Sequence, residues 1–302
     1  MINKNVLIVT GPTASGKSSL SVQLAKILDG EIISADSSQV YCGLDIGSAK
    51  ITPEEMKDIP HHLIDIKQPN EDFSVAEFKN LALDKIKQII SRNKTPIICG
   101  GTGLYIKALV NDYDFSNTPK NQDLREKIKQ EIIDNGLLST YNKLVDIAPE
   151  FAKTINENDE VRIIRAFEKV MGEKNDCSNV LNDYNYFVYV INDDRQIIYN
   201  NINKRVDLMI KDGLFEEVQK LIKQGINKNN SCFKSIGYKE IYDYYANNLD
   251  KNETIELIKQ KTRNYAKRQL TLYRGMKNVI WIDGENKLEK ILNDYKYRTN
   301  RK

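Results

Sequence analysis

A glycine-rich stretch near the start of the chain, GPTASGKS at residues 11–18, leaves few folds open. It fits the pattern G-x-x-x-x-G-K-[ST] and stands between an apolar run, residues 6–9, and an amphipathic segment, residues 17–28. Between a strand and a helix, the N–H groups of such a loop turn inward around an anion, and the helix N-terminus adds its dipole. Lys17 contributes a positive charge, and the Ser18 hydroxyl is placed to hold a Mg²⁺ ion. The stretch therefore predicts a phosphate-binding loop without saying whose phosphate it holds.

Short apolar runs bounded by turn residues continue along the chain and predict the strands of a sheet. Helical patterns at residues 17–28 and 75–92 separate the first four of these runs. Because strands and helices alternate, we expect an α/β fold, a P-loop NTPase-like parallel sheet flanked by helices. The predicted strands are residues 6–9, 31–34, 62–66, 96–99, 186–191 and 279–282.

Residues 120–182 follow a different pattern, which is helical and contains no strand-like run. We interpret them as a helical insertion domain that contacts its partner, within a P-loop-like catalytic core formed by 1–119 and 183–302. The alternative is a set of long surface helices within one domain. The expected helices are 123–134, 138–146 and, after the cap pair Asn158 and Asp159, 159–171.

The composition of the chain indicates where the protein is found more clearly than what it does. The net charge of the 302 residues is only +3, so any attraction to nucleic acid must come from local patches. With two histidines and no CxxC pair there is no zinc-finger spacing, and we expect reduced thiols in a cytoplasmic protein. We see no signal peptide, no run near the roughly 18 apolar residues of a membrane helix, and no sign of an obligate assembly, so we expect a monomer. The cysteines are Cys42, Cys99, Cys177 and Cys232.

An acidic residue, Asp36, follows the second predicted strand directly. Parallel sheets of this kind bind ligands beyond the carboxyl ends of their strands, so Asp36 is expected on the same edge as the phosphate loop. There it can serve as a Mg²⁺ ligand, as a general base or only as a helix cap. Ser37, Ser38, Gln39 and Tyr41 come next and suit the edge of a heterocyclic base better than a bare phosphate.

A second glycine turn, GGTG at residues 100–103, again joins a predicted strand to a predicted helix. Thr102 in this turn would face the same edge of the sheet. Taken alone the turn is a weak signal, because strand-to-helix connections often contain glycine.

A basic stretch lies in the C-terminal half. Residues 259–277 hold seven Lys or Arg and no Asp or Glu, and four of these basic residues recur at spacings of four and seven along one helical face. Such a face suits a polyphosphate backbone, although charged faces are often only solvated. The turn KSIGYK at 234–239 adds two lysines. Arg125, Arg162 and Arg165 add guanidiniums in the insertion, where the last two can also pair with Glu160 and Glu168.

Two classes of function can be weighed from these motifs alone. A small-molecule kinase or NTPase would use the loop, but the chain has no NKxD motif and no convincing later strand that ends in Asp; residues 186–193 are the nearest. A nucleic-acid-binding module with a vestigial loop would explain the basic stretch. It leaves the intact Lys17 and Ser18 unexplained.

Six motifs taken together resemble one family. GPTASGKS, SADSSQVYCGLDIGSAK, HHLIDI, GGTGLYIKAL, KSIGYKE and AKRQLTLYRG occur in this order. The set resembles the tRNA dimethylallyltransferases, also called tRNA isopentenyltransferases, over residues 6–283, and P-loop kinases share only its first member. Two departures stand out: Leu272 occupies a position where that family has Trp, and the zinc-finger extension of eukaryotic relatives is absent, as in the compact bacterial form.

The resemblance implies transfer of a dimethylallyl group from dimethylallyl diphosphate to the exocyclic amine of the adenine 3′ of the tRNA anticodon, with Mg²⁺ as cofactor. The loop would then bind the diphosphate that is released, with Lys17 and a Mg²⁺ ion on Ser18 stabilising its charge. Asp36 would accept a proton from the amine. The target base must leave its stack, and the helical insertion would grip the anticodon stem-loop.

The resemblance also implies the residues of the site. The catalytic residues would be Asp36, Lys17, Thr102 and Arg125, and the metal ligand would be Ser18. The diphosphate would be bound by Gly11, Pro12, Thr13, Ala14, Ser15, Gly16, Lys17 and Ser18. The tRNA would be bound by Asp36, Ser37, Ser38, Gln39, Thr102, Arg125, Glu160, Val161, Arg162, Ile163, Ile164, Lys234, Ser235, Ile236, Gly237, Tyr238, Lys239, Lys267, Arg268, Gln269 and Arg274.

Overall fold

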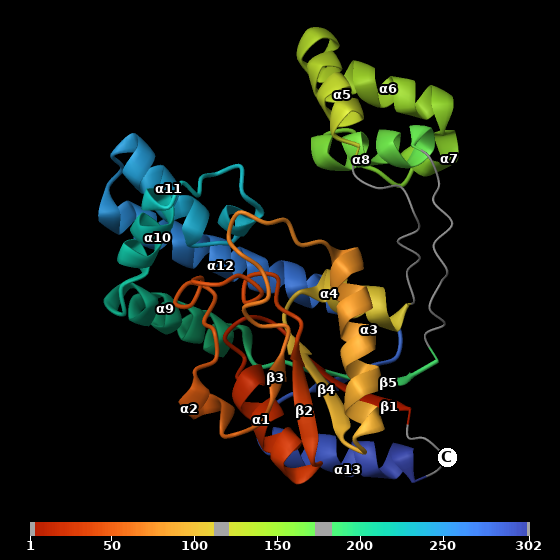
Figure 1. Cartoon of the computed structure of the whole chain (residues 1–302), viewed down its shortest axis with the longest axis vertical. Coiled ribbons are helices and arrows are strands. Elements are labelled where there is room, and N and C mark those ends of the chain that lie inside the picture. The colour runs from red at the N-terminus through yellow and green to blue at the C-terminus, as the bar shows by residue number, and fades with distance from the viewer. Residues whose placement is uncertain (1–3, 112–120, 173–182, 301–302) are drawn as a thin grey trace. The chain divides into compact units, whose positions relative to one another are not determined.

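The computed structural model describes residues 4–111, 121–172 and 183–300. The chain divides into two compact units (Figure 1). One unit consists of Met1–Tyr113 together with Asn182–Lys302, and the other is Asp114–Leu181.

The first unit is built on a six-stranded sheet in which every pairing is parallel, as the sequence predicted. β1 lies inside the sheet between β4 and β5. Its alternate residues face opposite ways: Val6 and Ile8 belong to one buried cluster, and Leu7 and Val9 to another. Burial on both faces explains why β1 reads as a continuous apolar run. The strands, in spatial order, are β3 (His61–His62), β2 (Gly30–Ser34), β4 (Thr95–Gly100), β1 (Asn5–Thr10), β5 (Asn185–Ile191) and β6 (Val279–Ile282).

Helices cover both faces of this sheet (Figure 1). On one face α3, α4 and the end of α12 pack through Phe78, Ile106 and Tyr273. On the other face α1 and α13 pack through Leu24 and Ile291. The helices of this unit are α1 (Lys17–Ile27), α2 (Pro53–Met56), α3 (Val75–Ser91), α4 (Gly103–Val110), α9 (Arg195–Lys211), α10 (Leu214–Lys223), the 3-10 turn η1 (Ser231–Lys234), α11 (Tyr238–Asn247), α12 (Lys251–Arg274) and α13 (Lys287–Thr299).

A separate apolar cluster packs the helices α9, α10, α11 and α12 against the segment that follows β2. Leu44 from that segment is buried against Val218, Phe233 and Tyr238. This cluster anchors residues 39–50 at the carboxyl end of the sheet.

The prediction of a strand at residues 62–66 is wrong beyond its first position. β3 ends at His62, because Leu63 and Asp65 adopt positive φ angles of 63° and 52°, which no strand accommodates. Leu63 is buried all the same. The chain turns here, and Ile66 N donates to the Val40 carbonyl at 2.9 Å. The apolar pattern therefore reflects burial in a turn and not an extended strand.

The described residues of the second unit, 121–172, form helices joined by short connections and contain no strand. Its core contains Ile128, Leu144, Ile163 and Phe167. The predicted cap is present, since the Asp159 side chain accepts from Arg162 N at the start of α8. The helices are α5 (Gln122–Asn135), α6 (Leu137–Ile147), α7 (Pro149–Ala152) and α8 (Glu160–Met171).

No helix among the described residues is long and apolar enough to cross a membrane. Cys42, Cys99 and Cys232 carry free thiols, and Cys177 lies outside the described residues.

Candidate active site

The predicted phosphate loop joins β1 to α1 and is held in shape by close approaches of the backbone. Gly11 has a φ of 146°, and a Cβ at this position would lie 2.4 Å from the Ile191 carbonyl oxygen at the end of β5. Only glycine fits there. Ala14 also has a positive φ, 62°, which bends the loop before α1 begins at Lys17.

A cavity of about 100 Å³ opens between this loop and the carboxyl ends of β2 and β4. Its charged lining residues are Lys17, Asp36 and Arg205 from α9, with Ser18 and Tyr265 among the polar ones. The lining also includes the apolar side chains of Ile32, Ala49, Ile51 and Ile64. The cavity therefore combines charged groups with apolar side chains.

Two partly buried cations, Lys17 and Arg205, line the cavity. Lys17 Nζ donates to the Pro12 carbonyl at 2.7 Å, and Arg205 Nη1 lies 3.4 Å from Thr13 Oγ1. Burial, which disfavours the charged form, lowers the pKa of Lys17 to about 8; the nearby Arg205 also lowers it, against Cys99 and Asp36. Burial likewise lowers the pKa of Arg205, while Asp36 raises it. An anion in the cavity would relieve both penalties.

Arg205 is the main site residue that the sequence analysis missed. It lies in the middle of α9, far along the chain from the loop and outside any motif. No local pattern separates it from the other charged residues of that helix.

The two carboxylate oxygens of Asp36 have different environments. Oδ1 accepts from Ser38 N at 2.8 Å and from Gln39 N at 3.3 Å; residues 37–40 form a turn and not a helix, so this oxygen closes a turn and the expected helix-capping role is wrong. Its Oδ2 has no hydrogen-bond partner within the described part of the chain. Asp36 lines the cavity and is its only acidic lining residue among those described. One oxygen thus fixes the side chain, and the other remains available for a ligand.

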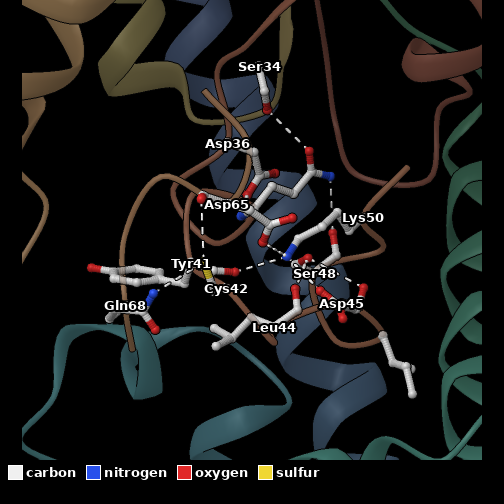
Figure 2. Close-up of polar contacts among 12 residues, drawn as sticks. Ser34, Asp36, Tyr41, Cys42, Leu44, Asp45, Ser48, Lys50, Asp65 and Gln68 are labelled. Atoms are coloured by element: carbon white, nitrogen blue, oxygen red, sulfur yellow. Dashed lines mark hydrogen bonds and ion pairs between the residues drawn. The ribbon is translucent and has the colours of Figure 1, made fainter. Parts of the chain in front are cut away.

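Residues 39–50 are held rigidly beside Asp36 (Figure 2). Gln39 accepts from Ser34 Oγ at 3.1 Å and donates to the carbonyls of Ser48 and Ala49. Lys50, almost fully buried, donates to the Tyr41 carbonyl at 2.9 Å and pairs with Asp45 and Asp65. The Gln39 amide, predicted to bind RNA, is therefore engaged within the protein.

Thr102 lies at the same edge of the sheet as Asp36 and contacts the neighbouring Ser37, but it is not among the described residues that line the cavity. Its Oγ1 accepts from Ser37 N at 3.0 Å, and its backbone N donates to the Ala35 carbonyl at 3.2 Å. Ser38 Oγ is 2.7 Å from Ser235 Oγ, which brings the turn before α11 to the same place. Three segments distant in sequence therefore meet at the carboxyl end of β2.

α12 presents two different faces. Lys267, Arg268 and Arg274 are exposed, and none of them has an ion-pair partner within the described residues. Gln269 is only 4% exposed and points the opposite way, toward the loop. Gln269 therefore lies on the inner face of the helix, where it lines the cavity, and it is not part of the exposed basic surface.

Basic residues in the first half of the stretch are bonded to other residues of α12 or of α9. Lys259 pairs with Asp207 of α9 at 2.8 Å and with Glu256. Arg263 donates to Asn203 at 2.6 Å. The continuous basic face expected from the sequence is therefore reduced to its C-terminal part.

The turn before α11 is similarly divided. Lys234 and Lys239 are exposed, and Ser235 and Ile236 are partly buried. Gly237 and Tyr238 are buried, and Tyr238 donates to Glu217 at 2.6 Å. Any contact of this turn with RNA would be made by its two lysines.

Arg125 and residues 160–164 belong to the helical unit. Arg125 Nε donates to Glu168 Oε1 at 2.6 Å, and Arg165 Nη1 donates to Glu168 Oε2 at 2.9 Å. Burial opposes the charge of Glu168, but these hydrogen bonds outweigh it and hold the pKa of the carboxyl below its usual value. Glu160, Val161 and Arg162 are exposed, whereas Ile163 and Ile164 lie in the core and cannot offer side chains to a partner.

The residues present suit a magnesium ion that is shared with a ligand. No group of three or more His, Cys, Asp or Glu that could hold a metal exists among the described residues. The Ser18 hydroxyl and the free oxygen of Asp36 both line the cavity. Mg²⁺ usually takes one or two protein oxygens and completes its shell with substrate phosphates and water, so these donors fit it.

This arrangement can bind an anionic ester that has an apolar tail and can withdraw a proton beside it. The two cations and the N–H groups of the loop would stabilise charge on a leaving phosphate group. The apolar lining residues would contact the tail, and Asp36 Oδ2 would accept the proton of an acceptor group.

Comparison with known proteins bears on this chemistry. A family model described as IPP transferase matches residues 39–276. A tRNA dimethylallyltransferase of Acetivibrio thermocellus is 44% identical over 302 residues, which cover 97% of this chain and 96% of that protein. The enzyme of the same name from Alkaliphilus oremlandii is 46% identical, with 98% of each chain covered.

Solved structures give the same likeness. The full-length tRNA isopentenylpyrophosphate transferase of Bacillus halodurans has a TM-score of 0.76 and 39% identity, covering 99% of this chain and 98% of that one. A eukaryotic dimethylallyltransferase acting on tRNA has a TM-score of 0.77 and 27% identity, covering 93% of this chain and 74% of that one.

Proposed function

This chain belongs to the IPP transferase family, and from that premise we propose that it acts as a tRNA dimethylallyltransferase. It transfers the dimethylallyl group of dimethylallyl diphosphate to the exocyclic amine of the adenine 3′ of the tRNA anticodon. One observation carries the proposal beyond family membership. The cavity brings two partly buried cations, Lys17 and Arg205, together with Asp36, a carboxylate that keeps one oxygen free.

The diphosphate is the group that leaves. The bond between the first carbon of the dimethylallyl group and the diphosphate oxygen breaks, and its electron pair stays on the diphosphate. Lys17, Arg205 and the loop N–H groups stabilise the negative charge that develops there. A bond forms between the same carbon and the adenine amine nitrogen. The amine proton passes to Asp36 Oδ2, since a delocalised amine is a weak nucleophile and needs a base as the bond forms.

Thr102 supports this step by its position. Its hydroxyl fixes the Ser37 backbone next to Asp36, so it keeps the carboxylate aimed into the cavity. Tyr265 closes the same side; its pKa is raised to about 12, mainly by burial and secondly by Asp36, so it remains a neutral phenol. The apolar lining residues Ile32, Ile51 and Ile64 take the five-carbon chain.

A Mg²⁺ ion would be held by Ser18 and by oxygens of the diphosphate. When bound, it would neutralise part of the charge on the leaving group. The protein would contribute the Ser18 oxygen to the ion, and Lys17 and Arg205 would add positive charge in the same cavity.

The RNA is expected to meet the exposed cations of the first unit. These are Lys234, Lys239, Lys267, Arg268 and Arg274. The target base would leave its stack to enter the cavity. Contact of the helical unit, including Arg125, with the anticodon stem-loop is part of the same proposal, as are the cytoplasmic location and the monomeric state.

The direct test is an incubation with dimethylallyl diphosphate, Mg²⁺ and unmodified tRNA, with the nucleosides then analysed by mass spectrometry. We expect a dimethylallylated adenosine, and we expect Asp36→Asn to lower its formation by about 10²- to 10⁴-fold while diphosphate binding is retained.

A parallel incubation with ATP and small acceptors tests the kinase alternative. Phosphoryl transfer without prenyl transfer would overturn the proposal. Near-normal turnover by Asp36→Asn would leave the reaction in place but remove the base from it.

A further inference from the structure

The buried face of α12 is bonded to both glycine turns at the carboxyl end of the sheet. Gln269 Oε1 accepts from Thr13 N in the phosphate loop at 2.9 Å. Its Nε2 donates to the Gly101 carbonyl in the second turn at 2.6 Å. One carboxamide therefore joins the loop after β1 to the loop after β4. Its orientation is fixed, because the N–H of Thr13 requires an acceptor and the carbonyl of Gly101 requires a donor.

Tyr273 makes a second link one helical turn further along the same face. Its hydroxyl lies 2.6 Å from Thr10 Oγ1, at the end of β1, and donates to the Gly101 carbonyl at 3.2 Å. The side chain has no exposed surface. Residues four apart share one face of a helix, so Gln269 and Tyr273 act on the same pair of turns.

The second glycine turn is shaped to receive this face. A Cβ at Gly101 would lie 2.5 Å from Gln269 Nε2, and a Cβ at Gly103 would lie 2.8 Å from Leu272 Cδ2. Neither glycine has a positive φ. Their lack of a side chain is thus explained by the approach of α12 and not by the turn's backbone angles. Leu272, which replaces an expected Trp, takes part in this packing.

We propose that Gln269 and Tyr273 are positioning residues that set the shape of the diphosphate site, and that Gln269 does not contact RNA. The N–H of Thr13 is one of the loop's inward donors, and Gln269 holds it. The remaining N–H groups of the loop, from Ala14 to Ser18, are then left to surround the anion. The inference rests on the proposed function for the identity of that anion.

The chemistry of the side chain explains why an amide is needed. Methionine has a similar length but neither donates nor accepts strongly, so it would leave Thr13 N–H without its acceptor and the Gly101 carbonyl with only the Tyr273 hydroxyl. Glutamate would accept from Thr13 but would face the Gly101 carbonyl with an acceptor, and it would add a negative charge next to the diphosphate.

The test separates positioning from RNA contact by measuring binding without RNA. Wild type and Gln269→Met are titrated with inorganic pyrophosphate and Mg²⁺ by calorimetry. Steady-state constants are then measured separately for dimethylallyl diphosphate and for tRNA. Gln260→Met is the control, because Gln260 is an exposed glutamine of the same helix.

We expect Gln269→Met to weaken pyrophosphate binding by roughly 10-fold, the cost of buried polar groups left unpaired. We also expect a lower kcat, with an unchanged KM for tRNA and an unchanged salt dependence of that KM. Gln260→Met should behave as the wild type.

A raised KM for tRNA with unchanged pyrophosphate affinity would overturn the inference and make Gln269 an RNA contact. If Gln269→Met fails to fold, Tyr273→Phe decides: it keeps the ring and removes only the hydroxyl, and unchanged pyrophosphate affinity in that variant would also overturn the inference. Wild type that binds pyrophosphate but transfers no prenyl group would refute the proposed function alone, because the pyrophosphate titrations still decide the role of Gln269.

Discussion

The charge of Lys17 makes the affinity for the diphosphate depend on pH in a range where few lysines titrate. Burial and Arg205 lower its pKa from 10.5 to about 8 in the ligand-free protein. A bound anion favours the charged form and raises that pKa again. The ligand therefore binds the protonated lysine, and affinity falls as pH rises through about 8.

The magnitude follows from the charged fraction. With a pKa of about 8, roughly 90% of the lysine is charged at pH 7, about 50% at pH 8 and about 10% at pH 9. If only the charged form binds, the dissociation constant rises about 10-fold between pH 7 and pH 9. By linkage, proton uptake on binding grows over the same range, from about 0.1 to about 0.9 per molecule.

Calorimetric titration with dimethylallyl diphosphate and Mg²⁺ measures both quantities, when it is repeated at three pH values in two buffers of different ionisation enthalpy. Lys17→Arg is the matched control, because its guanidinium stays charged throughout and it reports any titration of the ligand itself. A flat affinity from pH 7 to pH 9 in the wild type would refute the reasoning, as would an equal fall in the arginine variant.

Two further predictions concern charges outside the cavity. Reversal of Lys267 and Arg268 to Glu should weaken tRNA binding and reduce the slope of log affinity against log salt by about 2, with the affinity for pyrophosphate unchanged. The control is the change of the exposed Lys296 of α13 to Glu. Equal slopes in the variant and the wild type would place the RNA surface elsewhere. Glu168→Gln should lower the free energy of unfolding by about 2–3 kcal/mol, because it removes a buried carboxylate that binds Arg125 and Arg165; an unchanged midpoint in a urea titration at pH 7 would show that these pairs add nothing.

The sheet was predictable because burial on both faces leaves a simple trace. β1 and β4 are continuous apolar runs, and each ends in glycines that bend the chain away from the strand. The error at residues 62–66 has a physical cause. Leu63 is buried in a turn, and an apolar side chain reports that it is buried without reporting the φ angle of its backbone.

The site was predictable only where its residues are local. The phosphate loop and Asp36 follow strands that the sequence reveals, so their side of the cavity could be inferred. The role of Arg205 could not be inferred, because its place in the cavity depends on the packing of α9 against the loop. Gln269 is a different case. Ala266, Gln269 and Tyr273 recur at helical spacing and are all buried. Their spacing alone could have indicated a buried face of the helix. The basic residues between them led instead to the prediction that the whole stretch is exposed to RNA.

The basic stretch shows why charge counted along a chain misleads. Residues 259–277 contain no acid, yet Lys259 and Lys261 are paired with Asp207 and Glu240 from other helices. These pairs anchor the first half of α12 to α9 and α11.

The surroundings of Asp36 bear on the choice between prenyl and phosphoryl transfer. Asp36 is the only acidic residue among the described residues lining the cavity, and one of its oxygens is already occupied by backbone N–H groups. The remaining oxygen cannot coordinate Mg²⁺ and accept a proton at once. If it were the metal ligand of a kinase, Asp36→Asn would weaken Mg²⁺-dependent pyrophosphate binding. If it is the base of a transferase, that binding survives and only the transfer fails, so one titration on one variant decides between the two chemistries.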